Sequence, residues 1–263
     1  LFISEYVEGS YSNKAIELYN PTNEAIDLSK YSLSRWSNGS TTPLNTILSG
    51  TIEANDALVI GLDKRDPNGE GYEAPLWDGW YVFTDSITGL LDSIYTDEDN
   101  LMGRVDLFIC PNYEDGTMYF NGNDAVTLET AEGDIIDVIG KIGEDPGEAW
   151  GDENDAYWTK DQTLIRKAMV TGGFVYDPTQ PYSFDPTLEW DSLPRNTFTE
   201  LGQHTCNCPD MSLSEFESVV NLYPNPNNSG LLNIESTSPI QEINIYNLIG
   251  QSVFYKNFQG LMF

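Results

Sequence analysis

The stretch LFISEYVEGSYSNKAIELYNPTNEAIDL, residues 1–28, decides the fold of this chain. Residues 1–7 and 15–19 are mostly apolar, with few polar interruptions. Between them, residues 9–13 (GSYSN) are rich in turn-forming side chains, and residues 20–23 (NPTN) end the second run. This pattern predicts two strands joined by a loop, followed by a turn into a third strand.

Short β-prone runs of the same kind recur along the chain. They lie at residues 31–36, 47–52, 57–61, 125–129, 135–140 and 164–170. Turn signals separate several of them, including Asn38-Gly39, Asn55-Asp56 and Asn121-Gly122. Strands and turns at this spacing are typical of a β-sandwich or barrel, so we expect an all-β protein.

Residues 62–118 interrupt this pattern and are expected to be a loop-rich insertion. The segment contains the stretch DKRDPNGE at 63–70, an aromatic cluster at 77–83 and an acidic run at 97–100. Insertions in β-sandwiches lie in loops and often carry the specific function, so this segment is the first place in which we expect a ligand.

Charge limits the classes of partner. The chain of 263 residues has 12 Lys and Arg against 42 Asp and Glu, a formal net charge of −30. A nucleic acid would be repelled by most of such a surface, whereas divalent cations favour carboxylate oxygens. No apolar run is long enough to span a membrane. His204 is the single histidine, which argues against a His-based triad or a multi-His metal site.

Two candidate sites fall in the expected insertion. Asp63, Asp66, Asn68 and Glu70 place oxygen ligands two or three residues apart, loosely as in calcium loops; the competing interpretation is a solvated loop. Trp77, Trp80 and Tyr81 could form an aromatic platform for a sugar or a peptide; the competing interpretation is that they pack the insertion onto the sandwich. Calcium is thus the one cofactor that we expect.

The cysteines and the C-terminal residues suggest further organisation. Cysteine arithmetic allows a disulfide from Cys110 to either Cys206 or Cys208, with one thiol left over. Residues 206–219 lack β alternation and are expected to be a linker, and a new pattern of short strands begins at 220.

Residues 1–205 resemble a bacterial lamin tail domain of the secreted kind. Pieces that match in order are ISEY (3–6), KAIELYNPT (14–22), ALVI (57–60), FNGNDAVTL (120–128), IIDVIG (135–140) and LIRK (164–167). The resemblance implies an immunoglobulin-like β-sandwich and, in most members, a non-catalytic binding or structural module.

Residues 220–263 are similar to the C-terminal sorting domain of the type IX secretion system of Bacteroidota. The matching residues include Tyr223, Pro224, Asn225 and Pro226, together with Tyr246 and Gly250 in the run IYNLIGQ. Such domains continue through a further hairpin to a basic last strand. Because the sequence stops at Phe263, we expect a partial sandwich and an incomplete sorting domain.

These observations predict an exported protein, either secreted or on the outer face of the outer membrane. We expect a non-catalytic binding or adhesion module. The alternatives are a structural or assembly component without a ligand and a hydrolase of an extracellular polymer. The expected partners are the type IX translocon, its shuttle protein and an extracellular glycan or protein.

Overall fold

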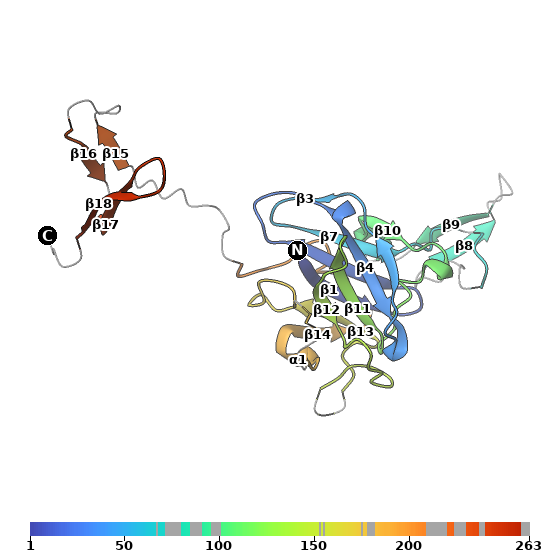
Figure 1. The fold of residues 1–263 in the computed structure, drawn as a ribbon. Helices are drawn as coiled ribbons and strands as arrows, with labels where there is room; N and C mark the ends of the chain where they lie inside the picture. Colours follow the sequence, from blue (N-terminus) through green and yellow to red (C-terminus); the bar gives the residue numbers. More distant parts are fainter. Residues whose placement is uncertain are drawn as a thin grey trace. The chain divides into compact units, whose positions relative to one another are not determined.

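The computed structural model divides the chain into two units, Leu1–Met211 and Ser212–Phe263 (Figure 1). It describes residues 1–66, 68–71, 80–84, 91–95, 101–152, 154, 156–174, 176–177, 182–208, 220–223, 230–236 and 240–258.

The N-terminal hairpin forms the centre of a six-stranded sheet. The strand order is β10 (Leu107–Ile109), β7 (Asp56–Leu62), β2 (Lys14–Asn20), β1 (Phe2–Glu8), β13 (Gln162–Arg166), β14 (Trp190–Pro194). Neighbouring strands are antiparallel except β10 and β7, which are parallel. The pairing of β1 with β2 confirms the hairpin predicted from residues 1–28.

A four-stranded sheet forms the second layer. Its order is β12 (Ile135–Ile139), β11 (Ala125–Thr130), β4 (Tyr31–Trp36), β5 (Leu44–Ile47). Two further strand pairs are β3 (Ile26–Asp27) with β6 (Thr51–Ile52) and β8 (Trp80–Thr84) with β9 (Leu91–Tyr95). The short helices are η1 (Leu28–Lys30), η2 (Ser37–Gly39), η4 (Met102–Arg104), η5 (Tyr113–Asp115) and α1 (Pro186–Glu189).

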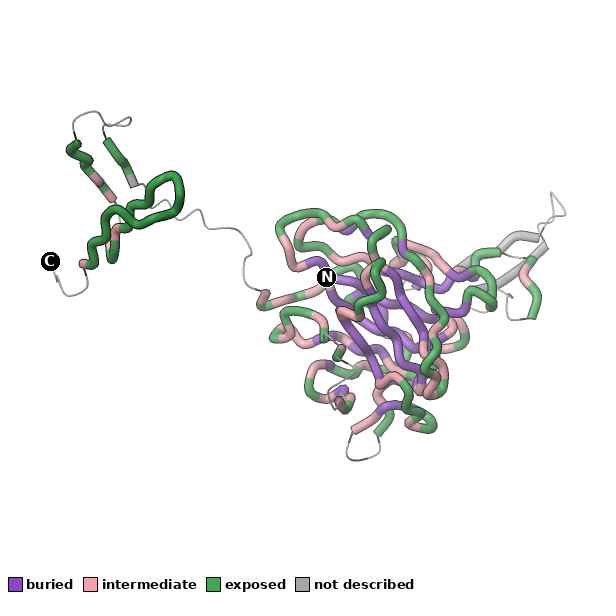
Figure 2. The backbone as a smooth tube through the Cα atoms, viewed as in Figure 1, coloured by how far each residue is buried: buried purple, intermediate pink, exposed green. Residues whose placement is uncertain are grey.

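The two sheets enclose one apolar core. Leu18 and Leu164 of the six-stranded sheet belong to the same buried cluster as Leu33 and Leu128 of the four-stranded sheet. Figure 2 shows that the strands in the middle of this unit are buried. Alternate residues of a strand point to opposite faces, so each strand contributes one face to this core. The expected all-β sandwich is therefore confirmed.

The expected bounds of the insertion, residues 62 and 118, both lie within the sandwich in the structure. Leu62 is the last residue of β7, and β10 returns to pair with that strand. Met118 is fully buried in the core between the sheets. Parts of this segment are thus built into the sandwich, because β10 and Met118 bury apolar surface that the sequence pattern alone could not assign.

A buried ion pair connects the two sheets. Asp137 of β12 and Arg166 of β13 have fully buried side chains, and Nη1 of the arginine lies 3.0 Å from Oδ2 of the aspartate. The same carboxylate accepts hydrogen bonds from the backbone N–H of Ile3 (2.8 Å) and of Phe174 (2.9 Å). The guanidinium also lies 4.6 Å from the ring centroid of Trp190. One carboxylate therefore joins the edge of one sheet to the middle of the other.

The outer face of the six-stranded sheet is covered as well. Val7, Ala15 and Val59 form a second buried cluster with three residues from loops, Leu101, Phe198 and Leu201. Covering segments on this face make the sheet buried on both sides, as the uninterrupted burial of β1 and β2 also shows.

Two glutamates are enclosed on this outer face. Glu5 of β1 lies opposite Glu17 of β2 in the strand register, and both are fully buried. Glu17 accepts hydrogen bonds from Ser4 Oγ (2.6 Å) and from the N–H of Gly202 (2.7 Å). The carboxyl oxygens of Glu5 have no hydrogen-bond partner among the described residues.

Burial raises the pKa of Glu5 to about 9, and the carboxylates of Glu17 and Glu200 add to this rise, whereas Arg104 opposes it. Burial likewise raises the pKa of Glu17 to about 7, despite its hydrogen bonds. The folded protein therefore holds a proton at this pair under conditions in which an exposed glutamate is ionised.

The second unit consists of hairpins. β15 (Val220–Tyr223) pairs with β16 (Asn233–Ser236), and β17 (Glu242–Tyr246) pairs with β18 (Ser252–Asn257). Apolar side chains such as Leu248 and Phe254 are exposed. Small hairpins that leave apolar groups in water are marginally stable by themselves.

The Asp137–Arg166 pair gives a first test. Asp137→Asn removes the buried carboxylate and leaves the guanidinium with only the part-exposed Glu189, 2.7 Å from Nη2. Removal of one partner of a buried pair typically costs about 3–5 kcal/mol. We expect a loss of that size in the free energy of unfolding, measured by urea denaturation. Glu144→Gln is the control, because the Lys141–Glu144 pair is exposed and such pairs contribute about 1 kcal/mol or less. Equal effects of the two substitutions would contradict the role given to Asp137.

The raised pKa of Glu5 gives a second test. The folded state binds a proton that the unfolded chain has released above the ordinary value of 4.5. The free energy of unfolding should therefore fall as the pH rises from about 4.5 to about 9. Glu5→Gln should flatten this fall, whereas Glu132→Gln, at an exposed hairpin tip, should leave it unchanged. Denaturation curves across this range measure the slope, and equal slopes in all three proteins would refute the assignment.

Candidate functional site

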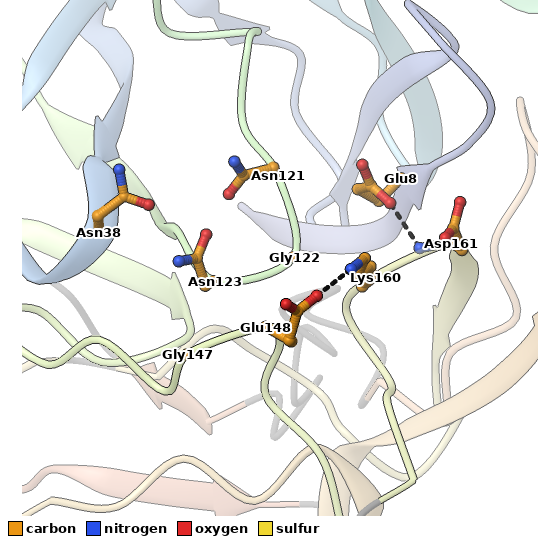
Figure 3. A pocket seen from close by; sticks show the side chains of 9 residues that line it. All are labelled: Glu8, Asn38, Asn121, Gly122, Asn123, Gly147, Glu148, Lys160 and Asp161. Atoms are coloured by element: carbon orange, nitrogen blue, oxygen red, sulfur yellow. Dashed lines mark hydrogen bonds and ion pairs between the residues drawn. The ribbon is translucent and has the colours of Figure 1, made fainter.

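Loops at one end of the sandwich surround a polar pocket of about 280 Å³, which we call the amide pocket (Figure 3). The loop after β4, the turn before β11 and the segment between β12 and β13 contribute its walls, together with the end of β1. The lining residues are Glu8, Asn38, Asn121, Gly122, Asn123, Gly147, Glu148, Lys160 and Asp161. Loops held by a rigid scaffold are the usual place for a binding site in a β-sandwich.

Asp124 holds two of these loops in place. Its buried carboxylate accepts hydrogen bonds from the backbone N–H of Asn38 (3.0 Å) and of Asn121 (3.1 Å). Arg35 Nη1 lies 3.8 Å from the same carboxylate. Burial raises the pKa of Asp124, while the two backbone donors and Arg35 oppose this rise. The carboxylate thus fixes the position of both asparagines relative to β11.

Close packing brings the third segment to the pocket. The hydroxyl of Thr159 donates to the carbonyl of Gly122 (2.5 Å) and accepts from the N–H of Trp150 (2.9 Å). A Cβ added to Gly122 would lie 2.4 Å from Cβ of Lys160. Glycine at 122 is therefore needed for the turn and the β12–β13 segment to approach this closely.

Charged groups in the walls are paired. Glu8 forms an ion pair with Lys14 and accepts a hydrogen bond from the N–H of Asp161. Glu148 pairs with Lys160, and this contact raises the pKa of the lysine. Asp161 pairs with Arg195 at 3.0 Å. Each charged side chain of the walls is thus paired, either within the walls or with Lys14 or Arg195 next to them.

The side-chain amides of the walls make fewer contacts than the charged groups do. Asn123 donates to Asp145 Oδ1 at 3.0 Å. The side-chain amides of Asn38 and Asn121 make no hydrogen bond within the part of the chain that the structure describes. Each amide offers two donors and one acceptor oxygen. The pocket therefore presents uncharged hydrogen-bonding groups to a ligand.

The residues predicted to bind calcium do not form such a centre in the structure. Both carboxylate oxygens of Asp63 accept from the guanidinium of Arg65, at 2.9 and 2.8 Å. Asp66 accepts from the N–H of Asn68 at 2.9 Å, which closes a local turn. No group of three or more His, Cys, Asp or Glu placed to hold a metal is found among the described residues. Calcium at Asp63, Asp66, Asn68 and Glu70 stays a prediction that this geometry does not support.

The predicted aromatic platform also stays a prediction. Trp77 lies outside the described residues, and Trp80 and Tyr81 are the first two residues of β8.

The predicted disulfide is wrong. Cys206 is bonded to Cys208, and Cys110 is a free, buried cysteine. Cys110 belongs to the core between the sheets, where its sulfur contacts the hydroxyl of Thr46. The segment with the other two cysteines lies against the residues after β13, where the N–H of Asn207 donates to the carbonyl of Ala168 (2.7 Å).

The single histidine packs against aromatic rings. His204 makes edge-on contacts with Phe2 and Tyr19, with centroid distances of 5.7 and 5.0 Å. Burial lowers the pKa of His204 to about 4, and Arg166 contributes to this lowering. The imidazole is thus neutral near pH 7, and its place is at the edge of the core rather than in the amide pocket.

The predicted sorting residues lie in the second unit. Tyr223 ends β15 and donates to Glu235 of β16. Tyr246 ends β17, and Gly250 has a φ of 81° in the turn that leads to β18. Pro224, Asn225 and Pro226 lie outside the described residues.

The amide pocket was not predicted from the sequence. Asn38-Gly39 and Asn121-Gly122 were recognisable as turns, but nothing in the pattern shows that the two turns meet. A turn signal reports local backbone preference, whereas the pocket depends on long-range contacts through Asp124.

Comparison with known proteins agrees with this architecture. The second unit matches the family described as Secretion system C-terminal sorting domain over residues 221–262, which is the type IX sorting domain. This domain indicates handling by type IX secretion and a secreted or cell-surface protein. The structure has no helix, among the described residues, that is long and apolar enough to cross a membrane. No curated protein matches the chain.

The first unit matches the family described as Lamin Tail Domain over residues 1–143, which is more than half of the chain. This family has an immunoglobulin-like fold, in agreement with the two packed sheets. Both matching families are non-catalytic modules. The chain belongs to the lamin tail domain family.

Proposed function

We propose that this protein is an exported, non-catalytic binding module whose amide pocket binds an uncharged polar ligand outside the cell. The observation that carries the proposal is that the Asn38 and Asn121 amides line one pocket whose charged groups are already paired. Adhesion to an extracellular polymer is the role that fits this arrangement.

The walls favour recognition by hydrogen bonds. Asn38 and Asn121 are positioned through backbone bonds to the buried carboxylate of Asp124, so their side chains remain available for a ligand. The backbone of both residues is fixed in advance, so binding has to order only their side chains. The volume of about 280 Å³ lies just below the range of about 300–1,000 Å³ common for drug-sized ligands, which suits a single small polar unit.

Charge supports an uncharged ligand. The formal net charge of −30 repels anions, including nucleic acids, at long range. A cationic ligand would have to compete with the lysines that are paired with Glu8 and Glu148. A neutral ligand meets neither obstacle.

A binding role also agrees with the chemistry of the walls. A hydrolytic site needs a nucleophile or a base held beside the bond to be cleaved. The described walls contain no Ser, Cys or His, and their carboxylates form ion pairs with Lys and Arg. These features support the non-catalytic interpretation that the two families suggest.

The sorting domain supplies the route out of the cell. We infer that the type IX translocon and its shuttle protein are the partners of the second unit, and that the first unit is their cargo. The chain divides between these parts near residues 211–212, so the two tasks lie in separate units.

The pocket is tested by Asn38→Gly. Asn38 has a φ of 47°, a conformation that glycine adopts without strain, so the substitution removes the amide and keeps the loop. We expect the full chain to bind one or more of a panel of immobilised neutral polysaccharides and uncharged peptides, and the variant to lose that binding while its melting temperature is maintained.

A matched control is Asn55→Gly. Asn55 is exposed, has a φ of 54° and lies in the turn before β7, outside the amide pocket. It should keep full binding. Unchanged binding in the Asn38 variant would remove the amide pocket from the proposal.

Export is tested by deletion of residues 220–263. We expect the shortened protein to accumulate in the periplasm of a host with type IX secretion, because it lacks the sorting domain, whereas the full chain appears outside the cell. Immunoblots of cell and medium fractions measure this. The melting temperature of the shortened protein controls for loss of the sandwich. A folded, shortened protein found outside the cell at the normal level would refute the sorting role.

A further inference from the structure

A second hollow, of about 340 Å³, lies beside the amide pocket, and we call it the tyrosine hollow. Its walls include Tyr11, Tyr113 and Tyr119, with Leu62 and Phe120 behind them. Asn121 lines both cavities. The ion pair between Glu8 and Lys14 also connects them, because Glu8 lines the amide pocket and Lys14 lines the tyrosine hollow.

The aromatic rings of this hollow are accessible. Tyr11 is 74% exposed and Tyr113 is 42% exposed. Tyr113 packs edge-on against Tyr119 with a centroid distance of 5.1 Å, so one ring supports the other. The hollow therefore offers aromatic surface to a ligand rather than burying it in the core.

The backbone holds Tyr11 in place at a cost. Its φ of 53° is left-handed, a conformation that a bulky side chain rarely adopts. The loop is fixed by the backbone bonds from Gly9 to Asn13 (2.8 Å) and from Asn13 to Ser10 (2.9 Å). The side chain of Asn196 accepts from the N–H of Ser10 at 2.9 Å. Strained residues of this kind persist where their position has a use.

We propose that the amide pocket and the tyrosine hollow form one binding site for a neutral carbohydrate. This inference rests on the proposed function and names its class of ligand. A pyranose ring has hydroxyl groups around its edge and an apolar face of C–H groups. Asn38 and Asn121 can bond the hydroxyls of one sugar unit, while Tyr11 or Tyr113 stacks on the apolar face of the next.

The strand arrangement disfavours a peptide ligand. One common mode of peptide recognition adds the peptide as a strand to an open sheet edge. The strands that reach these walls are β1, β2 and β7, and each has a neighbour on both sides in the six-stranded sheet. Strand addition is therefore closed at this site, and recognition uses groups of the loops, which suits hydroxyl groups and ring faces.

The experiment uses the full chain and soluble oligosaccharides of neutral β-glucan, α-glucan and mannan, together with an uncharged peptide as a separate arm. Isothermal titration with the oligosaccharide that binds most tightly gives the Kd. Tyr11→Gly suits the left-handed backbone, so it should maintain or raise the melting temperature while it weakens binding about tenfold or more. Tyr113→Ala should also weaken binding. Tyr11→Phe keeps the ring and should retain most of the affinity, and Asn55→Gly should bind as the parent does.

The outcomes separate this inference from the proposed function. Weaker binding in both the Tyr11→Gly and Asn38→Gly variants supports a joint carbohydrate site. Weaker binding in Asn38→Gly alone refutes a role of the tyrosine hollow in binding and is consistent with binding in the amide pocket. If the peptide binds and none of the oligosaccharides does, the assignment of the ligand as a carbohydrate is wrong. Absence of binding to every probe overturns the proposed function and this inference together.

Discussion

The carboxylate of Asp137 is the group through which the two layers of the sandwich are connected. It lies on the edge strand β12 of one sheet and bonds Arg166 and the backbone of Ile3 in the other. Apolar packing between sheets is largely non-directional, so by itself it allows the layers to slide. A fully buried pair with several hydrogen bonds favours one arrangement, because a shift would separate the Asp137 carboxylate from its donors. The alignment of the two sheets, from whose ends the loops extend, depends on this contact together with the apolar core.

The outer face shows the opposite use of buried carboxyls. Glu5 and Glu17 face each other across β1 and β2, and loops that include Phe198 and Leu201 enclose them. Burial of this pair costs less free energy when it is protonated than when it is ionised. The packing of these loops on the sheet is therefore most stable when the proton is present. Asp137 thus aligns the sheets as part of an ion pair. Glu5 and Glu17, in contrast, can be buried under the loops of the outer face because the pair is protonated.

Sequence reasoning succeeded where the signal was local or where a family pattern spans many residues. Residues 1–28 indicated the hairpin of β1 and β2 because strand and turn preferences are properties of short segments. It failed for Cys110, since spacing cannot show that this side chain is directed into the core, away from Cys206 and Cys208. It also missed the amide pocket, because Asn38 and Asn121 are 83 residues apart in the numbering of the chain and meet only through Asp124. Long-range polar contacts leave no periodic trace in a sequence.

Backbone strain gives an independent reason to place function at this end of the sandwich. Six non-glycine residues with positive φ are found among the described residues. Three of them, Tyr11, Asn38 and Asp161, line the amide pocket or the tyrosine hollow. A fourth, Asn196, holds the loop that carries Tyr11. The free-energy cost is largest for Tyr11, because asparagine and aspartate adopt a positive φ more readily than other non-glycine residues. Their gathering around two adjoining cavities supports the proposal that these loops bind a ligand.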